Sequence, residues 1–247
     1  MDRRSVAAPH RPLLLVAILI VLAVVAGAVA LAVAPVVRGP SEARSSVPEA
    51  VYSMPARPRL LILGDSYTEG YAASPPSKGY AVLVGESLGW PTDVDGVGGT
   101  GFTYGGPGGG DDDYVTRIER YVASSRFDPN VIVLEGSQND YRSVGAITGR
   151  VVTAVKTLRA AYPEARIVLF GPAAPEPLMS QLGPIDRADR AAADELRIPY
   201  ISPYQGQWFT TDNTATYGFE DGAHLNTAGH AYLAKRFLDE FRPLFGL

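Results

Sequence analysis

The chain has 247 residues, of which 46% are hydrophobic, and a formal net charge of −4 at pH 7. This hydrophobic fraction excludes a disordered chain, and the acidic balance argues against a nucleic-acid partner. No cysteine is present, which excludes disulfides, thiolate zinc sites and cysteine nucleophiles.

Residues 13–37 form an uncharged, strongly apolar segment near the start of the chain. Its length is sufficient for a helix that crosses the hydrocarbon core of a membrane. Arg3, Arg4 and Arg11 precede it, and because positive residues favour the cytoplasmic side we expect residues 1–12 to be cytoplasmic. The sequence therefore predicts a membrane-anchored protein with an extracytoplasmic domain.

A cleaved signal peptide is the alternative interpretation of this segment. Small residues at 28–30 and 32–34 resemble cleavage sites, and cleavage would make the protein secreted. The apolar run is longer than a usual signal core of about 7–15 residues, which favours the anchor. A proline-rich stretch at 38–58 then predicts a semi-extended linker, followed by one folded domain at 59–247.

Apolar runs and helical periodicities alternate through the folded domain. Strands are expected at 60–63, 93–95, 131–134, 167–170 and 199–201. Helices are expected at 79–88, 114–122, 144–162, 185–196 and 226–241. This alternation predicts an α/β fold, with a parallel sheet covered by helices on both faces.

Polar, glycine-bearing segments occur at the ends of these strands and before the last helix, where a parallel sheet binds its ligands. They span residues 64–67, 96–101, 136–140 and 221–224. The second segment formally matches a dinucleotide-binding fingerprint. The residues after it, Phe102 to Pro107, cannot open the helix which that motif requires.

These segments contain the residue types of nucleophilic ester cleavage. A serine hydroxyl needs a base within hydrogen-bonding reach, and the base needs a third group to hold its tautomer. We predict Ser66 as nucleophile, His224 as base and Asp221 as the residue that orients the base. His10 precedes the apolar segment, so the remaining histidine, His230, is the only rival base, and we expect it to pack on or along the last helix.

The four segments resemble those of the SGNH hydrolases in the GDSL esterase/lipase superfamily. They read GDSYTEG, GVGGTGF, GSQND and DGAHLNTAGH, in the family's order, and the resemblance covers nearly all of residues 60–242. It implies a three-layer α/β/α sandwich, flavodoxin-like in outline, with a mainly parallel five-stranded sheet. It also implies hydrolysis through an acyl-enzyme, without cofactor or metal.

The resemblance assigns the oxyanion hole to the backbone N–H groups of Ser66 and Gly99 and to the side-chain amide of Asn139. Two positions depart from the family pattern. Ser137 stands where the third block usually has glycine, and we expect the preceding Gly136 to meet the conformational need. Asp95 is nearest to the asparagine that often precedes the glycines of the second block, and this departure leaves Gly98 as the neighbouring alternative to Gly99.

Several of these residues also have a purely structural interpretation. Ser66 could cap a helix, and Asp65 and Asp140 are expected to be turn or capping residues. Asp111 to Asp113 are expected to form a solvated helix start rather than a cation site. Four aromatic residues before Asp221 either line a substrate pocket or only pack: Tyr204, Trp208, Phe209 and Tyr217.

The leading prediction is an esterase that acts outside the cytoplasm on a small acyl group of a small-molecule, glycan or lipid ester. Its expected partners are that substrate and the membrane, through the N-terminal segment. One alternative is an acyltransferase that uses the same triad. The other is a non-catalytic glycan-binding module on the hydrolase scaffold.

Overall fold

The computed structural model describes residues 54–247, and five parallel strands at its centre form a single sheet. The strands are β1 (Leu60–Gly64), β2 (Thr92–Gly96), β3 (Val131–Glu135), β4 (Arg166–Phe170) and β5 (Tyr200–Ile201). Their spatial order is β2-β1-β3-β4-β5. The prediction of an α/β fold around a five-stranded parallel sheet is confirmed.

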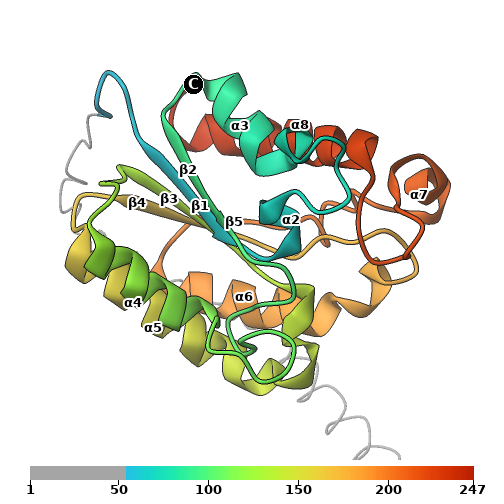
Figure 1. The fold of residues 1–247 in the computed structure, drawn as a ribbon, viewed down its shortest axis with the longest axis horizontal. Coiled ribbons are helices and arrows are strands. Elements are labelled where there is room, and N and C mark those ends of the chain that lie inside the picture. Colours follow the sequence, from blue (N-terminus) through green and yellow to red (C-terminus); the bar gives the residue numbers. More distant parts are fainter. Residues whose placement is uncertain (1–53) are drawn as a thin grey trace, which may run out of the picture. The chain divides into compact units, whose positions relative to one another are not determined.

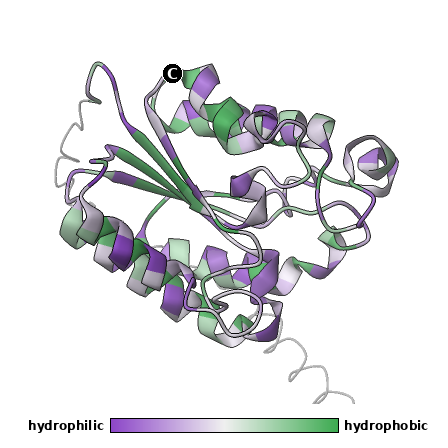
Figure 2. Ribbon diagram, in the orientation of Figure 1, coloured by the Kyte–Doolittle hydropathy of each residue, from purple (hydrophilic) through white to green (hydrophobic). Residues whose placement is uncertain are grey.

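Helices cover both faces of the sheet. They are α2 (Ser66–Glu69), α3 (Tyr80–Leu88), α4 (Tyr114–Ser124), α5 (Val144–Ala161), α6 (Gly183–Leu196), α7 (Thr211–Tyr217) and α8 (Thr227–Leu244). Figure 1 shows α2, α3 and α8 on one face and α4, α5 and α6 on the other, which gives three layers. The apolar strands lie between these layers, and the helices turn their hydrophilic sides outward (Figure 2).

The sequence located most elements to within a few residues, and local signals explain why. β1 and β3 are completely buried and apolar except for Glu135 at the end of β3, as expected for inner strands of a parallel sheet. Asp113 caps α4 by accepting from the N–H groups of Val115 and Thr116, and Asn226 caps α8. The solvated helix start predicted at Asp111 to Asp113 is therefore confirmed at Asp113.

Helix α7, like the four-residue α2, is absent from the helices that the sequence predicts. It has only seven residues, and several of them are threonine or asparagine, which are poor helix formers. A capping box between Thr210 and Asn213 holds its first turn. That box was the one local signal for this helix.

The predicted membrane span, 13–37, lies outside the described residues, as does most of the predicted linker. No helix within residues 54–247 is both long and apolar enough to cross a membrane.

The strand order creates a switch point beside β1. Its two neighbours are β2 on one side and β3 on the other, so the chain builds outward in both directions from this strand. Loops that leave the carboxyl ends of such strands diverge and leave a crevice, which is where α/β proteins bind ligands. Ser66, Gly99 and Asn139 all lie shortly after the carboxyl ends of strands at this edge.

Candidate active site

Ser66 is the first residue of α2 and directly follows β1. Asp65 caps this short helix, because its Oδ1 accepts from the N–H of Tyr67 at 2.9 Å. The interpretation of Ser66 as the helix cap is therefore wrong, and the structural role predicted for Asp65 is confirmed. With capping done by its neighbour, the Ser66 hydroxyl is left for another partner.

That partner is His224, whose Nε2 lies 2.9 Å from Ser66 Oγ. The other ring nitrogen, Nδ1, lies 2.6 Å from Asp221 Oδ2. Asp221 is an acceptor, so His224 donates from Nδ1 and leaves Nε2 to accept the serine proton. The structure thus brings together the three residues that the sequence singled out from positions more than 150 apart.

The turn from Asp221 to His224 is held by its own first residue. Asp221 Oδ1 accepts from the backbone N–H groups of Ala223 and His224, both at 2.9 Å, and Gly222 takes a φ of +70° that favours glycine. Burial by itself raises the pKa of Asp221, but the hydrogen bonds from Ala223 and His224 outweigh it, and the net shift is downward. Asp221 therefore stays ionised beside the imidazole.

Asn139 lies in a short 3-10 helix, Gln138–Arg142, directly after β3. Its Nδ2 lies 2.9 Å from Thr100 O, 2.9 Å from Ser137 Oγ and 3.2 Å from Asp65 Oδ2. These contacts join the third polar segment to the first and second. The amide hydrogens are shared among internal acceptors beside the serine loop.

The glycine loop after β2 lies against the nucleophile. A Cβ added to Gly98 would lie 3.7 Å from Ser66 Cβ, so Gly98 is the loop residue that faces the serine. Gly99 follows with a φ of +74°, a conformation that side chains other than glycine rarely adopt. The structure thus shows Gly98 facing Ser66, and it shows Gly99 facing Pro107.

Buried carboxyl groups surround the base of the site. Burial raises the pKa of Asp65 to about 6, although hydrogen bonds from Ser137 and Tyr67 and the charge of His224 act in the opposite direction. Burial also raises the pKa of Glu135 well above its usual range, and this side chain accepts from Thr68 Oγ1. Burial therefore favours the neutral form of both carboxyl groups.

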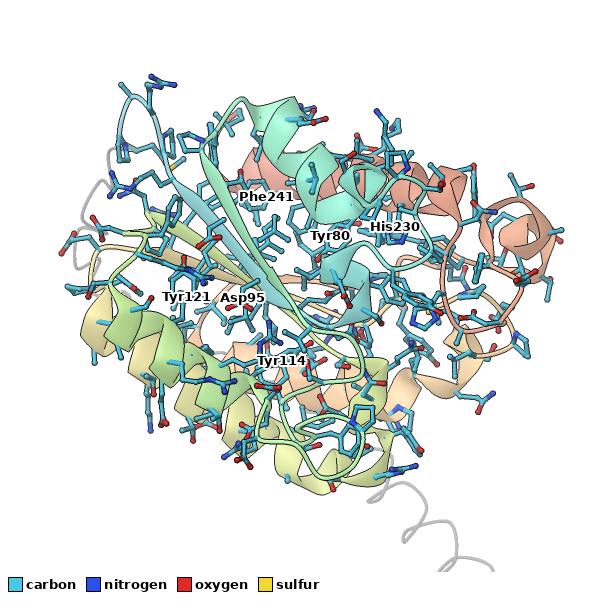
Figure 3. The ribbon with its side chains drawn as sticks, in the orientation of Figure 1. Tyr80, Asp95, Tyr114, Tyr121, His230 and Phe241 are labelled. Atoms are coloured by element: carbon cyan, nitrogen blue, oxygen red, sulfur yellow. The ribbon has the colours of Figure 1, made fainter. Side chains whose placement is uncertain are left out.

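The structure gives positioning roles to two residues, of which the sequence did not single out Arg117 and marked Ser137 only as a departure from the family pattern. Arg117, on α4, is almost completely buried and donates to Gly64 O at 2.8 Å, Thr100 Oγ1 at 3.0 Å and Asp95 Oδ1 at 2.6 Å. It ties the ends of β1 and β2 to the glycine loop. Its only signal was a charged side chain on the buried face of an amphipathic helix, between Tyr114 and Tyr121; these two residues and Asp95 are labelled in Figure 3.

The second is Ser137, the departure from the family pattern. Its Oγ lies 2.6 Å from Asp65 Oδ2 and accepts from the backbone N–H of Asn139 at 3.0 Å. Its φ is −111°, so the position does not require glycine. Gly136 is needed for space instead, because a Cβ there would lie 2.3 Å from Asp189 Oδ2.

The remaining predicted residues take structural positions. His230 is buried and packs between α8 and the start of α3, as expected; it is labelled beside Tyr80 in Figure 3. Asp140 is buried and accepts from the N–H groups of Phe102 and Thr103, which is a turn-holding role across two loops.

Of the four aromatic residues before Asp221, two only pack, and two line a cavity formed by residues other than the triad. Trp208 is buried in the core, and Tyr217 stacks on Tyr232. Tyr204 and Phe209 line a cavity of about 320 Å³ together with polar side chains that include Glu176.

Comparison with solved structures finds the same fold at low sequence identity. A carbohydrate acetylesterase family member from Sinorhizobium meliloti is 18% identical, with a TM-score of 0.59, over 77% of this chain and 100% of the other. A family two carbohydrate esterase from Clostridium thermocellum, in complex with cellohexaose, is also 18% identical, with a TM-score of 0.59, over 78% and 67%. The salicylyl-acyltransferase SsfX3 from a tetracycline biosynthetic pathway is 17% identical, with a TM-score of 0.60, over 79% and 57%.

The curated proteins contain no match to this chain. The family model of the GDSL-like lipases and acylhydrolases, in contrast, matches residues 62–232, which is most of the chain and all four polar segments up to His224. The chain therefore belongs to the GDSL-like lipase/acylhydrolase family, the SGNH hydrolases, which are carboxylic ester hydrolases.

Proposed function

We propose that this protein is a serine esterase that hydrolyses short acyl esters, such as acetyl esters, outside the cytoplasm. The observation that carries the proposal is the continuous line from Ser66 Oγ to His224 Nε2, at 2.9 Å, and from His224 Nδ1 to Asp221 Oδ2, at 2.6 Å. Each group has the neighbour that its role requires.

In this mechanism Ser66 Oγ attacks the ester carbonyl carbon while His224 Nε2 takes the hydroxyl proton. The carbonyl oxygen becomes an oxyanion, which the N–H groups of Ser66 and Gly99 and the Nδ2 of Asn139 would stabilise. The C–O bond to the alcohol then breaks, and the imidazolium gives its proton to the departing oxygen. Water repeats the sequence on the acyl-enzyme and releases the acid and free Ser66.

A glycan acetyl ester is the substrate class that the comparisons support best. Two of the similar structures are named as carbohydrate esterases or acetylesterases, one of them in complex with an oligosaccharide. Similarity to an acyltransferase of the same fold keeps transfer to an alcohol as the second candidate. Adding a free sugar alcohol to the assay separates the two, because a transferase releases an acylated sugar in place of the acid.

The test compares the purified full chain with three triad variants on p-nitrophenyl acetate. Ser66→Ala and His224→Ala should lower kcat by at least about 1,000-fold. Asp221→Asn should also lower kcat strongly, because the imidazole of His224 then loses the carboxylate that holds its tautomer. Ser124→Ala, at the last residue of α4, is the matched control and should retain activity. Wild-type activity in Ser66→Ala would overturn the proposal, as would failure of a fluorophosphonate to label Ser66.

Anchoring through residues 13–37 is a separate proposal, supported by the length of the apolar segment and the arginines before it. It predicts that the exported protein keeps its full mass and sediments with membranes. A mass lower by about 30 residues would establish the secreted alternative instead.

A further inference from the structure

Tyr71 presents a half-exposed aromatic ring directly beside the catalytic imidazole proposed above. Its ring centroid lies 4.5 Å from that of His224, and 49% of the residue is exposed to solvent. The ring of Phe219 meets it edge-on at 6.4 Å. An aromatic ring in contact with a catalytic group, yet open to solvent, has one face available to a substrate.

The backbone around Tyr71 has an unusual conformation, and two hydrogen bonds hold it. Gly70 and Ala72 on either side have φ values of +82° and +66°, and the latter is a strained conformation for alanine. The Tyr71 N–H donates to Ser66 O at 2.9 Å, and its carbonyl accepts from His230 Nε2 at 2.9 Å. Nothing in the core needs the exposed ring, so the strain points to a functional reason for presenting it.

The chemistry determines which part of the substrate lies on this side. His224 gives its proton to the departing alcohol, so the alcohol lies next to the imidazole in the transition state. The donors proposed for the oxyanion lie in the loops of Gly99 and Asn139. The exposed face of Tyr71 therefore borders the alcohol part of the ester and not its acyl part.

The surroundings favour a sugar over a lipid alcohol. The only large apolar side chains exposed among residues 54–247 are Tyr71, Tyr141, Leu244 and Leu247, and the two leucines lie at the C-terminus. Such scattered residues form no continuous apolar surface for an alkyl chain. The flat ring of Tyr71 suits the C–H face of a sugar. The exposed acidic residue Glu220, in the adjoining turn, suits the sugar's hydroxyl groups.

We propose that Tyr71, supported by Phe219, is the stacking platform for a pyranose ring in the alcohol part of the substrate and sets the enzyme's alcohol specificity. This inference rests on the proposed esterase function and adds to it the side of the ester at which the sugar binds.

The test varies the alcohol and the acyl group separately. In Tyr71→Ala, kcat/KM for an acetylated methyl xylopyranoside should fall about 5- to 10-fold, mainly through KM, as expected for loss of one stacking contact. On methyl acetate, whose alcohol is too small to reach the ring, the loss should be smaller, so the ratio of the two kcat/KM values is the readout. A cooperative thermal unfolding transition would show that the variant is folded. Tyr71→Phe should keep the wild-type preference for the sugar ester.

Two controls make the outcome decisive. Tyr141, the other exposed tyrosine, contacts Arg142 and lies in the 3-10 helix of Asn139, on the oxyanion side, so Tyr141→Ala should leave the ratio between the two substrates unchanged. Preference along a series of p-nitrophenyl esters of increasing acyl length should be the same in Tyr71→Ala and wild type. If Tyr71→Ala lost the same fraction of kcat/KM on the sugar acetate and on methyl acetate, the stacking proposal would be wrong. The same holds if Tyr141→Ala lost as much selectivity between these two substrates as Tyr71→Ala. A wild-type protein inactive on every ester would instead reject the esterase function itself.

Discussion

At the scale of single residues, Asp65 joins the serine loop to the asparagine loop. One oxygen caps α2, and the other lies 2.6 Å from Ser137 Oγ and 3.2 Å from Asn139 Nδ2. The hydrogen bonds from Ser137 and Tyr67 favour the ionised carboxylate, whereas burial disfavours it. Burial outweighs these hydrogen bonds and raises the pKa of Asp65 to about 6.

The stability of the protein should therefore respond to the ionisation of Asp65. The folded pKa of about 6 lies above the unfolded value, so this group's stabilising contribution is complete below about pH 4 and is lost as the pH rises through 6. The total is on the order of 2 to 3 kcal/mol. Urea unfolding between about pH 4 and 7 should show wild type losing stability relative to Asp65→Asn as the pH rises. Parallel curves for the two proteins would contradict the assignment.

At the scale of elements, the position of Ser66 depends on how closely β2 approaches α2. Gly96 ends β2, and a Cβ added there would lie 2.1 Å from Glu69 N and 2.5 Å from Glu69 Cα. These are backbone atoms, which cannot rotate away as a side chain can. Because Gly96 has no side chain, helix α2, which begins at Ser66, can lie against the sheet.

Gly96→Ala should push α2 away from the sheet and displace Ser66. Overpacking of this kind costs about 1–3 kcal/mol, and a displacement of about 1 Å at the nucleophile lowers kcat by roughly 100-fold. The matched control is Gly149→Ala in the exposed part of α5, where the added Cβ would meet nothing within 4 Å. That change should stabilise the protein by about 0.5–1 kcal/mol. The two are compared by thermal unfolding and esterase rates, and equal effects would contradict the steric argument.

At the scale of the whole molecule, His230 joins the last helix to segments that are 150 residues earlier. Its Nδ1 accepts from the N–H of Tyr80, at the start of α3, and its Nε2 donates to Tyr71 O at 2.9 Å. Only the neutral ring can do both. Burial lowers its pKa, the charge of His224 acts in the same direction, and the hydrogen bond to Tyr71 opposes them without reversing the shift.

His230→Gln should weaken this connection and change the acid stability. A depressed folded pKa means that the contribution of His230 is present above the unfolded value, near 6.5, and is lost as the pH falls through the folded value. At neutral pH the variant should be less stable by about 1–3 kcal/mol, because buried partners lose their hydrogen bonds. As the pH falls below 6.5 and through the lower folded value, the difference should shrink, since wild type then loses the same bonds. Chemical unfolding at two pH values measures this, and a constant difference would count against it.

The features of this protein that can be predicted from its sequence are those set by interactions between residues close together in the chain. The strands and most helices were located because apolar periodicity and capping residues act within a few positions, and α7 was missed where such signals are weak. Ser66, Asn139, Asp221 and His224 were selected because their loops hold the residue types that acyl transfer needs. Local sequence thus determined the type and order of the elements and the candidates for chemistry.

Tertiary structure alone decided the contacts between these segments. Three contacts join residues from different loops or helices. They are the hydrogen bond from Ser137 to Asp65, the hydrogen bonds of Arg117 to the ends of two strands, and the ring contact of Tyr71 with His224. Burial, which sets the pKa of Asp65, also exists only once the layers have packed. The physical reason is that side-chain spacing along one element is local, whereas distance and dielectric between elements depend on the path of the whole chain.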